Sequence, residues 1–475
     1  MVRVAPRLSL VFSALCLAGV AHAQSCPATL PAQGAPIAAP LPVFPADNWW
    51  NTDISAAPVD PLSPAYIAWI DPAKPVHPDF GGAGAGTNEV YGFPYVMVNG
   101  AQPKWQVTFD YWDESDGNGV PFYPLPENVL TTVGWVEGGP PATVDLRGSN
   151  DRHILIVDCT NRTLYELYNA WFSSQERRWY AGSGAFFDMK TNNRRPEGWT
   201  SADAAGLAIF PGLVRYDEAA NANVAEIQHA FRVTVRASNG HVYPASHSAG
   251  TTSGALPMGA RLRLKKSVNG VDPVTRTNDP TARKIFRAMQ KYGLIVADNG
   301  TDMYISGTYD VRWNNDTLNP AFHSLRAGDF EVVQLGWKPA PPLPTLSVGD
   351  VALSEGHSGT KTMSFTVKLS AASTNTVNVS FKTSNGSAVA GTDYTAALGT
   401  ISFSPGQTSR SVAVTLRGDR TPEKSETFAL NLSNPVNATL RDGVAIGTIT
   451  NDDQLRTGGP GQKTPPTPAA VRFEK

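Results

Sequence analysis

Seven of the nine acidic side chains in the segment 344–453 fall at loop positions beside turn-forming residues, and this pattern constrains the fold more than any other feature of the chain. Their neighbours include Gly, Pro, Asn and Thr, which are typical of loops. If one fold gathered these carboxylates without a cation, they would repel one another strongly, so a divalent ion would stabilise it. The seven residues are Glu355, Asp393, Asp419, Glu423, Glu426, Asp452 and Asp453.

Six sequence blocks follow one another along the same segment. They are L-S-V-G-D-V-A-L-S-E-G-H-S-G (Leu346–Gly359), A-G-T-D-Y (Ala390–Tyr394), F-S-P-G-Q-T (Phe403–Thr408), E-K-S-E-T-F (Glu423–Phe428), L-S-N-P (Leu432–Pro435) and G-T-I-T-N-D-D (Gly447–Asp453). The blocks and their order resemble one Calx-beta module. The resemblance implies an immunoglobulin-like β-sandwich over residues 344–453, with calcium as its ligand, in a protein that works outside the cytoplasm.

The resemblance also implies that the seven carboxylates named above are the calcium ligands. Calcium takes about six to eight oxygen ligands, which loops converging at one end of a sandwich can supply. Two positions depart from the family pattern, since Asp419 stands alone between Gly418 and Arg420, and Asn451 opens the last acidic triplet. Fewer anions predict fewer ions or weaker affinity. The alternative is a metal-free sandwich whose turn acids are simply solvated.

The N-terminus has the pattern of a secretory signal. Arg3 and Arg7 precede an apolar core, Leu8–Val20, that is too short to span a bilayer, and Ala21-His22-Ala23 fits a cleavage site. We therefore expect a secreted protein, extracellular or periplasmic, without a membrane span. The expected organisation is a signal peptide (1–23), a Pro/Ala-rich lead-in (24–45), a β-rich domain (46–337), a proline linker (338–343), the Calx-beta domain (344–453) and a disordered tail (454–475).

Charge and composition narrow the class of protein. The chain has 39 basic and 41 acidic residues, a formal net charge of −2, so nothing favours a polyanion partner and we expect no binding of nucleic acid. The 42 glycines and 38 prolines fit a loop-rich, mostly β protein. Cys26 and Cys159 remain after removal of the signal, and they are either a disulfide or two separate thiols.

Short β-branched and aromatic runs between turn signals predict a large β-rich body, sandwich- or barrel-like, with one or two helices. Ile154–Val157 is apolar on both faces, which predicts a central buried strand, whereas the alternation of Arg261–Leu264 predicts a strand with one face in water. Asp279 and Gly293 are the expected ends of one helix, which starts with Pro280. A second, shorter helix is expected to begin at Ser201.

Five residues of this body are candidates for catalysis. His229 is either a general base or acid, with Glu226 in the preceding turn as its partner, or a histidine satisfied in the core. His247 lies in a loop-like context that presents a side chain either to a cleft or to solvent. Arg194 and Arg195 are either clamps for an anionic group such as a uronate or loop surface.

Glu166 stands among apolar residues, where a carboxylate is either paired structurally or raised in pKa for acid catalysis. Arg162, Arg177 and Arg178 are the expected partners in the structural case. The sequence has no G-x-S-x-G elbow, no H-E-x-x-H and no phosphate-binding glycine loop, which disfavours serine hydrolases, zincins and nucleotide-dependent enzymes.

The N-terminal body has no motif that assigns an activity. Segments such as W-W-N-T-D-I-S (Trp49–Ser55) and K-Y-G-L-I-V-A-D (Lys291–Asp298) resemble a group of uncharacterised secreted bacterial proteins, and that resemblance implies no mechanism. Its many tryptophans and tyrosines fit a groove for a glycan. We therefore expect a polysaccharide-active enzyme, hydrolase or lyase, whose partner is an extracellular polysaccharide or a cell-surface glycan. The alternative is a non-catalytic adhesion or matrix protein.

Overall fold

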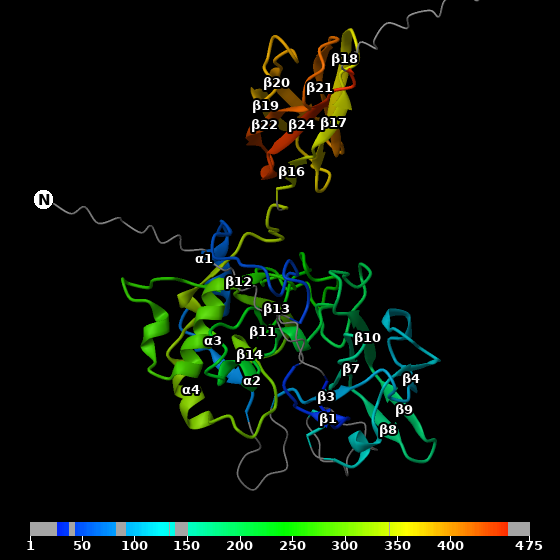
Figure 1. Ribbon diagram of the computed structural model, residues 1–475. Helices are drawn as coiled ribbons and strands as arrows, with labels where there is room; N and C mark the ends of the chain where they lie inside the picture. Colours follow the sequence, from blue (N-terminus) through cyan, green and yellow to red (C-terminus); the bar gives the residue numbers. More distant parts are fainter. Residues whose placement is uncertain are drawn as a thin grey trace, which may run out of the picture. The chain divides into compact units, whose positions relative to one another are not determined.

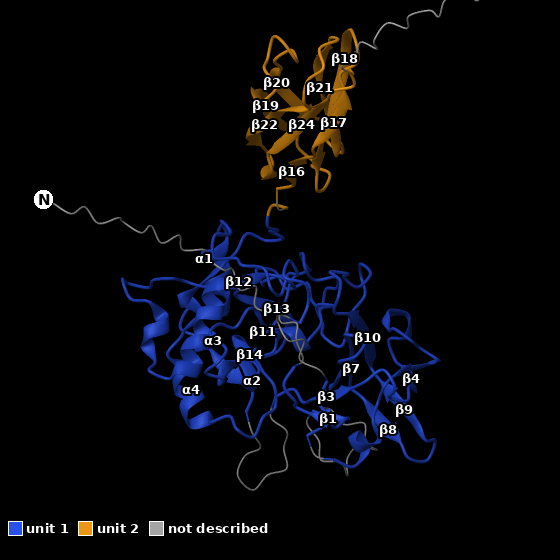
Figure 2. Cartoon of the chain, in the orientation of Figure 1, with its two compact units in different colours: residues 1–339 blue, residues 340–475 orange. Residues whose placement is uncertain are grey.

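The computed structural model describes residues 26–37, 43–81, 92–132, 134–137, 151–341 and 343–454. The chain divides into two compact units, residues 1–339 and 340–475 (Figure 2). The expected signal peptide and all but the first residue of the expected tail lie outside the described residues. The two units are described separately below.

The first unit contains a five-stranded and a four-stranded sheet, with strand orders β1-β3-β6-β7-β10 and β5-β4-β9-β8. All five residues of β6 are buried, and it lies between β3 and β7, which confirms the predicted central strand. The strands of these sheets are β1 (Ala32–Gln33), β3 (Tyr95–Val98), β4 (Trp105–Phe109), β5 (Pro121–Tyr123), β6 (Ile154–Asp158), β7 (Thr163–Tyr168), β8 (Trp171–Ser173), β9 (Arg178–Ala181) and β10 (Ser183–Asp188).

A six-stranded sheet forms the rest of the first unit, in the order β15-β12-β13-β11-β14-β2. Its neighbours β11 and β13 run parallel, so their carboxyl ends lie at the same edge. The strands are β2 (His77–Asp79), β11 (Phe231–Val235), β12 (Arg261–Leu264), β13 (Leu294–Asn299), β14 (Tyr304–Ser306) and β15 (Phe330–Val332).

Helices α3 and α4 lie next to each other, and α3 packs on this sheet through β12 (Figure 1). Phe286 of α3 and Phe322 of α4 meet edge to face at 5.4 Å between ring centroids, inside the largest apolar core of the unit. The helices are α1 (Ser63–Ile70), α2 (Tyr216–Ala219), α3 (Pro280–Lys291) and α4 (Asn315–His323), and the 3₁₀ helices are η1 (Trp112–Glu114), η2 (Glu127–Leu130), η4 (Phe210–Gly212), η5 (Pro273–Arg276) and η6 (Ala327–Asp329).

The local signals predicted α3 correctly. The Asp279 carboxylate accepts the backbone N–H of Ala282 at 2.7 Å, which satisfies one free donor of the first turn. Gly293 follows the helix with a φ of 77°, a conformation that side chains with a Cβ rarely adopt. With 12 residues α3 is the longest described helix, and none of the described helices has the length and apolarity that crossing a bilayer requires.

Two predictions for the first unit are wrong. No helix begins at Ser201, because its hydroxyl accepts the Asp203 N–H in a turn and the Asp203 carboxylate binds Arg232 on β11. Strand β12 has no face in water, since Arg261 and Arg263 are only 5% and 8% exposed. Each guanidinium is buried because it donates to backbone carbonyls of the segment that precedes α1.

Glu166 is fully buried on β7 and has no arginine partner among the described residues. Its carboxylate accepts the backbone N–H groups of Ile209 and Phe210 at 2.9–3.0 Å, where η4 begins. Burial raises the pKa of this carboxyl to about 7. Glu166 is therefore paired structurally, but its partners are backbone N–H groups and not the predicted arginines. Cys26 and Cys159 form a disulfide that fastens the lead-in beside the end of β6.

The second unit is a β-sandwich, and its two sheets have the orders β21-β18-β16-β23 and β17-β24-β22-β19-β20. Alternate residues of β18 are buried, which is the pattern of a strand with one face on a core. The strands are β16 (Thr345–Val348), β17 (Val351–Ser354), β18 (Gly359–Leu369), β19 (Val377–Asn385), β20 (Leu398–Phe403), β21 (Ser409–Gly418), β22 (Glu426–Val436), β23 (Thr439–Asp442) and β24 (Val444–Thr450). The mostly β class and the C-terminal sandwich are confirmed.

Aromatic residues from both sheets fill the centre of the sandwich. Phe428 stacks on Tyr394 at 4.3 Å between ring centroids and meets Phe365 edge to face at 5.9 Å. All three are at most 1% exposed. The second unit therefore has an apolar core of its own.

Replacing Phe365 by alanine should lower the free energy of unfolding of this unit by about 3–5 kcal/mol, because the ring leaves a cavity between the sheets. Leu398→Ala is the matched control, since Leu398 is 77% exposed and its truncation should change the value by about 0.5 kcal/mol or less. Urea unfolding read by hydrogen exchange of peptides from 343–454 measures both. Equal values for the two variants would contradict this packing.

Candidate functional site

The predicted metal ligands come from loops that the sandwich brings to one end. Strands β17 and β24 are parallel neighbours that pair Ser354 with Thr450, so Glu355 and the pair Asp452 and Asp453 follow them at the same edge. Strand β21 ends at Gly418, opposite the start of β18, and the segment with Asp419 and Glu423 follows it. We call this end of the sandwich, with the seven predicted carboxylates, the acidic pole.

Glu355 is the most enclosed of the seven carboxylates. The residue is 3% exposed, and its backbone N–H donates to the Thr450 carbonyl at 3.3 Å. Burial, followed by the negative charges of Glu423, Asp419, Asp453 and Asp452, raises the pKa of its carboxyl to about 7. These acids therefore lie close enough to act on one another.

Two further carboxyls at the pole respond to the same crowding. Loss of hydration and the charges of Asp419, Asp393 and Asp453 raise the pKa of Glu423. Loss of hydration, the charges of Asp393 and Glu423 and a hydrogen bond with Asp393 raise the pKa of Glu426. The structure thus brings all seven predicted residues into one electrostatic cluster.

Local turns orient two aspartates of the pole. The Val389 N–H donates to Asp393 Oδ2 and the Thr421 N–H donates to Asp419 Oδ1, each at 2.6 Å. Each bond ties one carboxylate oxygen to the backbone of its own loop. Asp452 Oδ1 likewise accepts the Gly356 N–H at 3.1 Å, which joins the last loop to the loop of Glu355.

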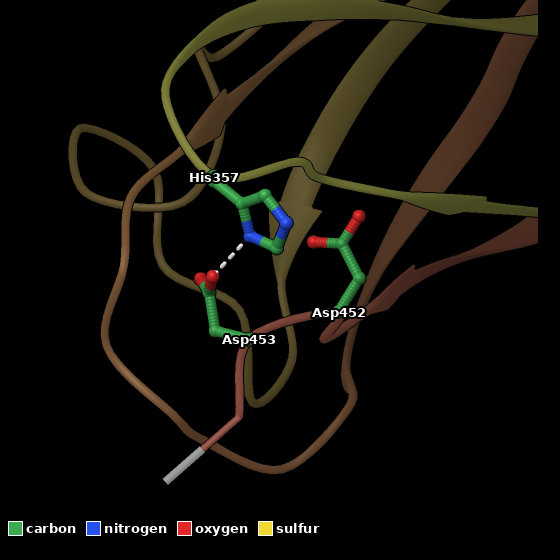
Figure 3. A group of neighbouring side chains, drawn as sticks. All are labelled: His357, Asp452 and Asp453. Carbon is green, nitrogen blue, oxygen red and sulfur yellow. Dashed lines mark hydrogen bonds and ion pairs between the residues drawn. The ribbon is translucent and has the colours of Figure 1, made fainter. Parts of the chain in front are cut away.

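His357 also belongs to the acidic pole, although it was not predicted. Figure 3 shows its ring between Asp452 and Asp453, with Nδ1 bonded to Asp453 Oδ1. Ligand atoms of these three residues lie within 4.8 Å of one another. Asp453 Oδ2 is buried and has no hydrogen-bond partner in the described part of the chain. The sequence signal was its place two residues after Glu355, in the same turn.

This arrangement has the chemistry of a site for a hard divalent cation. Carboxylate oxygens are the ligands that calcium prefers, and a cation would relieve the repulsion among them. The buried Oδ2 of Asp453 provides a test of fit, because a buried acceptor without a donor is costly unless an ion or water satisfies it. The residues present therefore fit a calcium ion.

The catalytic candidates of the first unit do not form one cluster. His229 is buried, and its ring nitrogens bond to Glu218 Oε1 at 2.8 Å and to the Ala230 carbonyl at 2.9 Å. Its carboxylate partner is therefore Glu218, eleven residues earlier, and Glu218 also binds Arg215. The predicted partner Glu226 is exposed and instead forms an ion pair with Lys291 at 2.9 Å.

Both candidate arginines are occupied by acceptors of the protein itself. Arg194 donates to the carbonyls of Pro244 and Ala245 and to Glu197. Arg195 is 6% exposed, pairs with Asp116 and donates to two backbone carbonyls. Neither guanidinium is therefore held ready for an anionic ligand.

His247 lies in the wall of a cavity of about 420 Å³. Its Nδ1 bonds to the Ala204 carbonyl at 2.8 Å. The cavity wall also contains Asp298 and Asn299 at the end of β13, which had no predicted role. Of the five candidates, only His247 lines this cavity. The sequence signal for Asp298 and Asn299 was a polar pair directly after the apolar run Leu294–Ala297.

In the metal-free protein, the pKa of Glu355 predicts the sign of a pH effect. Between the usual glutamate pKa and about 7, the unfolded chain loses a proton that the folded chain keeps, so the free energy of unfolding should fall as pH rises. Urea unfolding in chelator across this window, read by hydrogen exchange of peptides from 343–454, measures the slope. Glu355→Gln should flatten it, and identical slopes for the two proteins would contradict the assignment.

Comparisons with known proteins match the second unit. Residues 349–453 match the family model of the Calx-beta domain. Sodium/calcium exchanger 1 of Canis lupus familiaris and that of Bos taurus are each 44% identical over 61 residues, or 13% of this chain. The chain spans about 6% of the length of these curated relatives.

Two solved structures are similar to the same part of the chain. The apo-form Calx CBD1 domain is 23% identical, covers 23% of this chain and 99% of its own, and has a TM-score of 0.22. CBD12 from CALX1.2 is 25% identical, covers 23% of this chain and 46% of its own, and also has a TM-score of 0.22. With the sandwich and the family match together, residues 349–453 are a Calx-beta domain.

Proposed function

We propose that the second unit binds Ca²⁺ at the acidic pole, in a protein that works outside the cell. The observation that carries this proposal is Glu355, which is almost completely buried among four other acids with its pKa raised to about 7. A protein that buries a carboxylate next to like charges gains stability when a cation joins them. The curated relatives that share this segment are named sodium/calcium exchangers.

Glu355, Asp419, Glu423, Asp452 and Asp453 would hold the ion, because these five carboxyls act on one another most directly. Asp393, whose charge raises the pKa of Glu426, and Glu426 itself would complete the set. The ion would supply positive charge that makes the anionic form of each carboxyl favourable. Arg420 beside Asp419 and Asn451 in the last loop reduce the negative charge of the pole, which favours weak binding. Extracellular calcium modules operate at about 10⁻⁴–10⁻³ M.

Isothermal titration of the full chain with Ca²⁺ tests the site. Glu355→Gln should weaken binding by about tenfold or more, because it removes the most enclosed anionic ligand. Asp350→Asn is the matched control, since Asp350 precedes β17, at the opposite end from Glu355, and accepts the Ile446 N–H. Heat of binding that persists unchanged in Glu355→Gln would refute the site.

We propose that the first unit acts on a polysaccharide. The support is a cavity of about 420 Å³ whose wall includes Tyr111, 53% exposed. Exposed aromatic rings provide flat apolar faces of the kind on which a sugar ring can stack. His247 is the candidate for proton transfer, because it alone of the predicted residues lines the cavity. The alternative is a non-catalytic adhesion protein, which would bind a glycan at the same cavity without any reaction.

A panel of polysaccharides should distinguish the two. Wild type should release new reducing ends, or unsaturated products that absorb in the ultraviolet, from at least one polysaccharide. Tyr111→Ala should lower that rate, because the exposed ring that lines the cavity is lost without disturbing the core. His229→Ala should lower stability, because its partner Glu218 is left buried. Binding to the panel without any product would support the adhesion protein instead.

A further inference from the structure

We propose that the cavity beside β13 is a binding site for an amino sugar, that is, for a glycan unit with several hydroxyls and one positively charged amine. The inference rests on the proposed action on a polysaccharide and specifies the class of ligand. Its volume of about 420 Å³ falls in the range of roughly 300–1,000 Å³ that is usual for small-molecule sites. The cavity is built from several parts of the first unit, which include the ends of β7 and β13, the start of β10, the loop 200–204 and the segment around η1.

The wall of the cavity is rich in hydrogen-bond acceptors. Nδ1 of His247 must carry the proton, because it faces the Ala204 carbonyl, and this leaves Nε2 of the neutral ring as an acceptor. Asn299 donates its amide to the Ala249 carbonyl at 2.9 Å. Its Oδ1 is buried and has no partner among the described residues. Nε2 of His247 therefore presents an acceptor to a ligand, whereas the unpartnered Asn299 oxygen is buried behind the surface of the wall.

The hydroxyl groups of Ser183 and Thr200 in the wall are also acceptors for a ligand. Ser183 Oγ donates to the Ser201 carbonyl at 2.6 Å, and Thr200 Oγ1 donates to the Asp203 carbonyl at 3.2 Å. Each hydroxyl has one proton, so these bonds leave only lone pairs for a ligand. A ligand that brings its own donors satisfies such a wall, and hydroxyls and an ammonium group are donors.

Charge selects a cation over an anion. The wall contains Glu114, Asp151, Asp203 and Asp298, and none of the described residues that line it is a lysine or an arginine. Arg232 lies behind the wall, where it binds both oxygens of Asp203 at 2.8–2.9 Å and Asp298 Oδ2 at 2.7 Å. One guanidinium thus serves two carboxylates, which leaves an excess of negative charge.

Asp298 is the cavity acid whose protonation state burial changes. Burial raises the pKa of its carboxyl to about 6, the charge of Arg232 opposes the rise, and the charge of Asp203 adds to it. A cation in the cavity would favour the ionised form. An anionic sugar such as a uronate would meet repulsion from the same groups, and the guanidinium groups of Arg194 and Arg195 are committed elsewhere.

A metal ion fits the cavity less well than an organic cation. Among the described residues, the group of His, Asp and Glu side chains whose ligand atoms approach within 4.8 Å is at the acidic pole, and the cavity acids do not form another. Their separation suits a ligand several bonds wide that contacts each in turn. The exposed ring of Tyr111, which lines the cavity, would stack on the neighbouring sugar of a chain.

Isothermal titration of the full chain with three tetrasaccharides of equal length tests the proposal near neutral pH. We expect the glucosamine tetramer to bind, cellotetraose to bind about tenfold or more weakly, and tetragalacturonate to give no heat of binding. A monoamine without hydroxyls, such as butylamine, should not compete at equal concentration. The proposal is overturned if the glucosamine tetramer fails to bind, or if the uronate binds equally well.

Variants locate the binding. Glu114→Gln should weaken binding of the glucosamine tetramer by about tenfold, and it should fold, because the amide oxygen can still accept the Thr200 N–H that Glu114 accepts at 2.9 Å. Asp298→Asn should act likewise if its circular dichroism matches wild type. Asp316→Asn, an exposed acid on α4, is the control and should bind normally. Wild-type affinity in Glu114→Gln would overturn the site.

The outcomes separate this proposal from the function on which it rests. Charge-dependent binding without any product from the polysaccharide panel would leave the site intact and remove the enzyme. Product formation that does not depend on Glu114 or Asp298 would keep the enzyme and remove this site.

Discussion

Arg232 is the residue on which the centre of the first unit depends. Its side chain is 3% exposed, and it donates to Asp203, Asp298 and the Ser306 hydroxyl. A buried guanidinium is costly unless its donors are satisfied, and here the partners come from three different segments. The cation therefore fixes the loop 200–204 against the ends of β13 and β14, and the wall of the cavity follows from that placement.

The second unit handles buried charge in the opposite way. At the acidic pole, carboxyls accumulate, and the exposed side chain of His357 is the partner that the described structure gives the Asp453 carboxylate. The first unit supplies an internal counter-ion to two acids, whereas the second gathers acids whose repulsion an external ion would relieve. Buried carboxylates therefore have a structural role in one case, and they favour a ligand in the other.

Where a structure is determined by neighbours along the chain, the sequence was sufficient. Asp279 and Gly293 marked the ends of α3 because caps act within one turn. The Calx-beta domain could be predicted because its turn motifs are local and occur in a fixed order. Six of the seven predicted acids lie in the quoted motifs, whereas Asp419 lies between two of them.

Where distant segments decide, the sequence misled. Asp203 had the signal of a helix N-terminus, but the ion pair with Arg232 prevailed. His229 was matched to a nearby acid, whereas its partner Glu218 reaches it from α2. The arginines of β12 alternate as if one face met water, yet backbone carbonyls from residues 49–57 cover them. Asp298 became a candidate only when folding placed it beside His247 in one cavity.

The bond between Cys26 and Cys159 joins residues 133 positions apart and closes a loop that contains η1 and its two exposed aromatic rings. Tying the ends of so long a loop removes freedom mainly from the unfolded chain, by about 4–5 kcal/mol in the simplest entropy treatment. The free energy of unfolding of the chain thus depends on whether the compartment in which it is made is oxidising enough to form the bond. Protein produced in a reducing cytosol would have the same sequence but would lack this bond, so its stability would be measured against a less restricted unfolded chain.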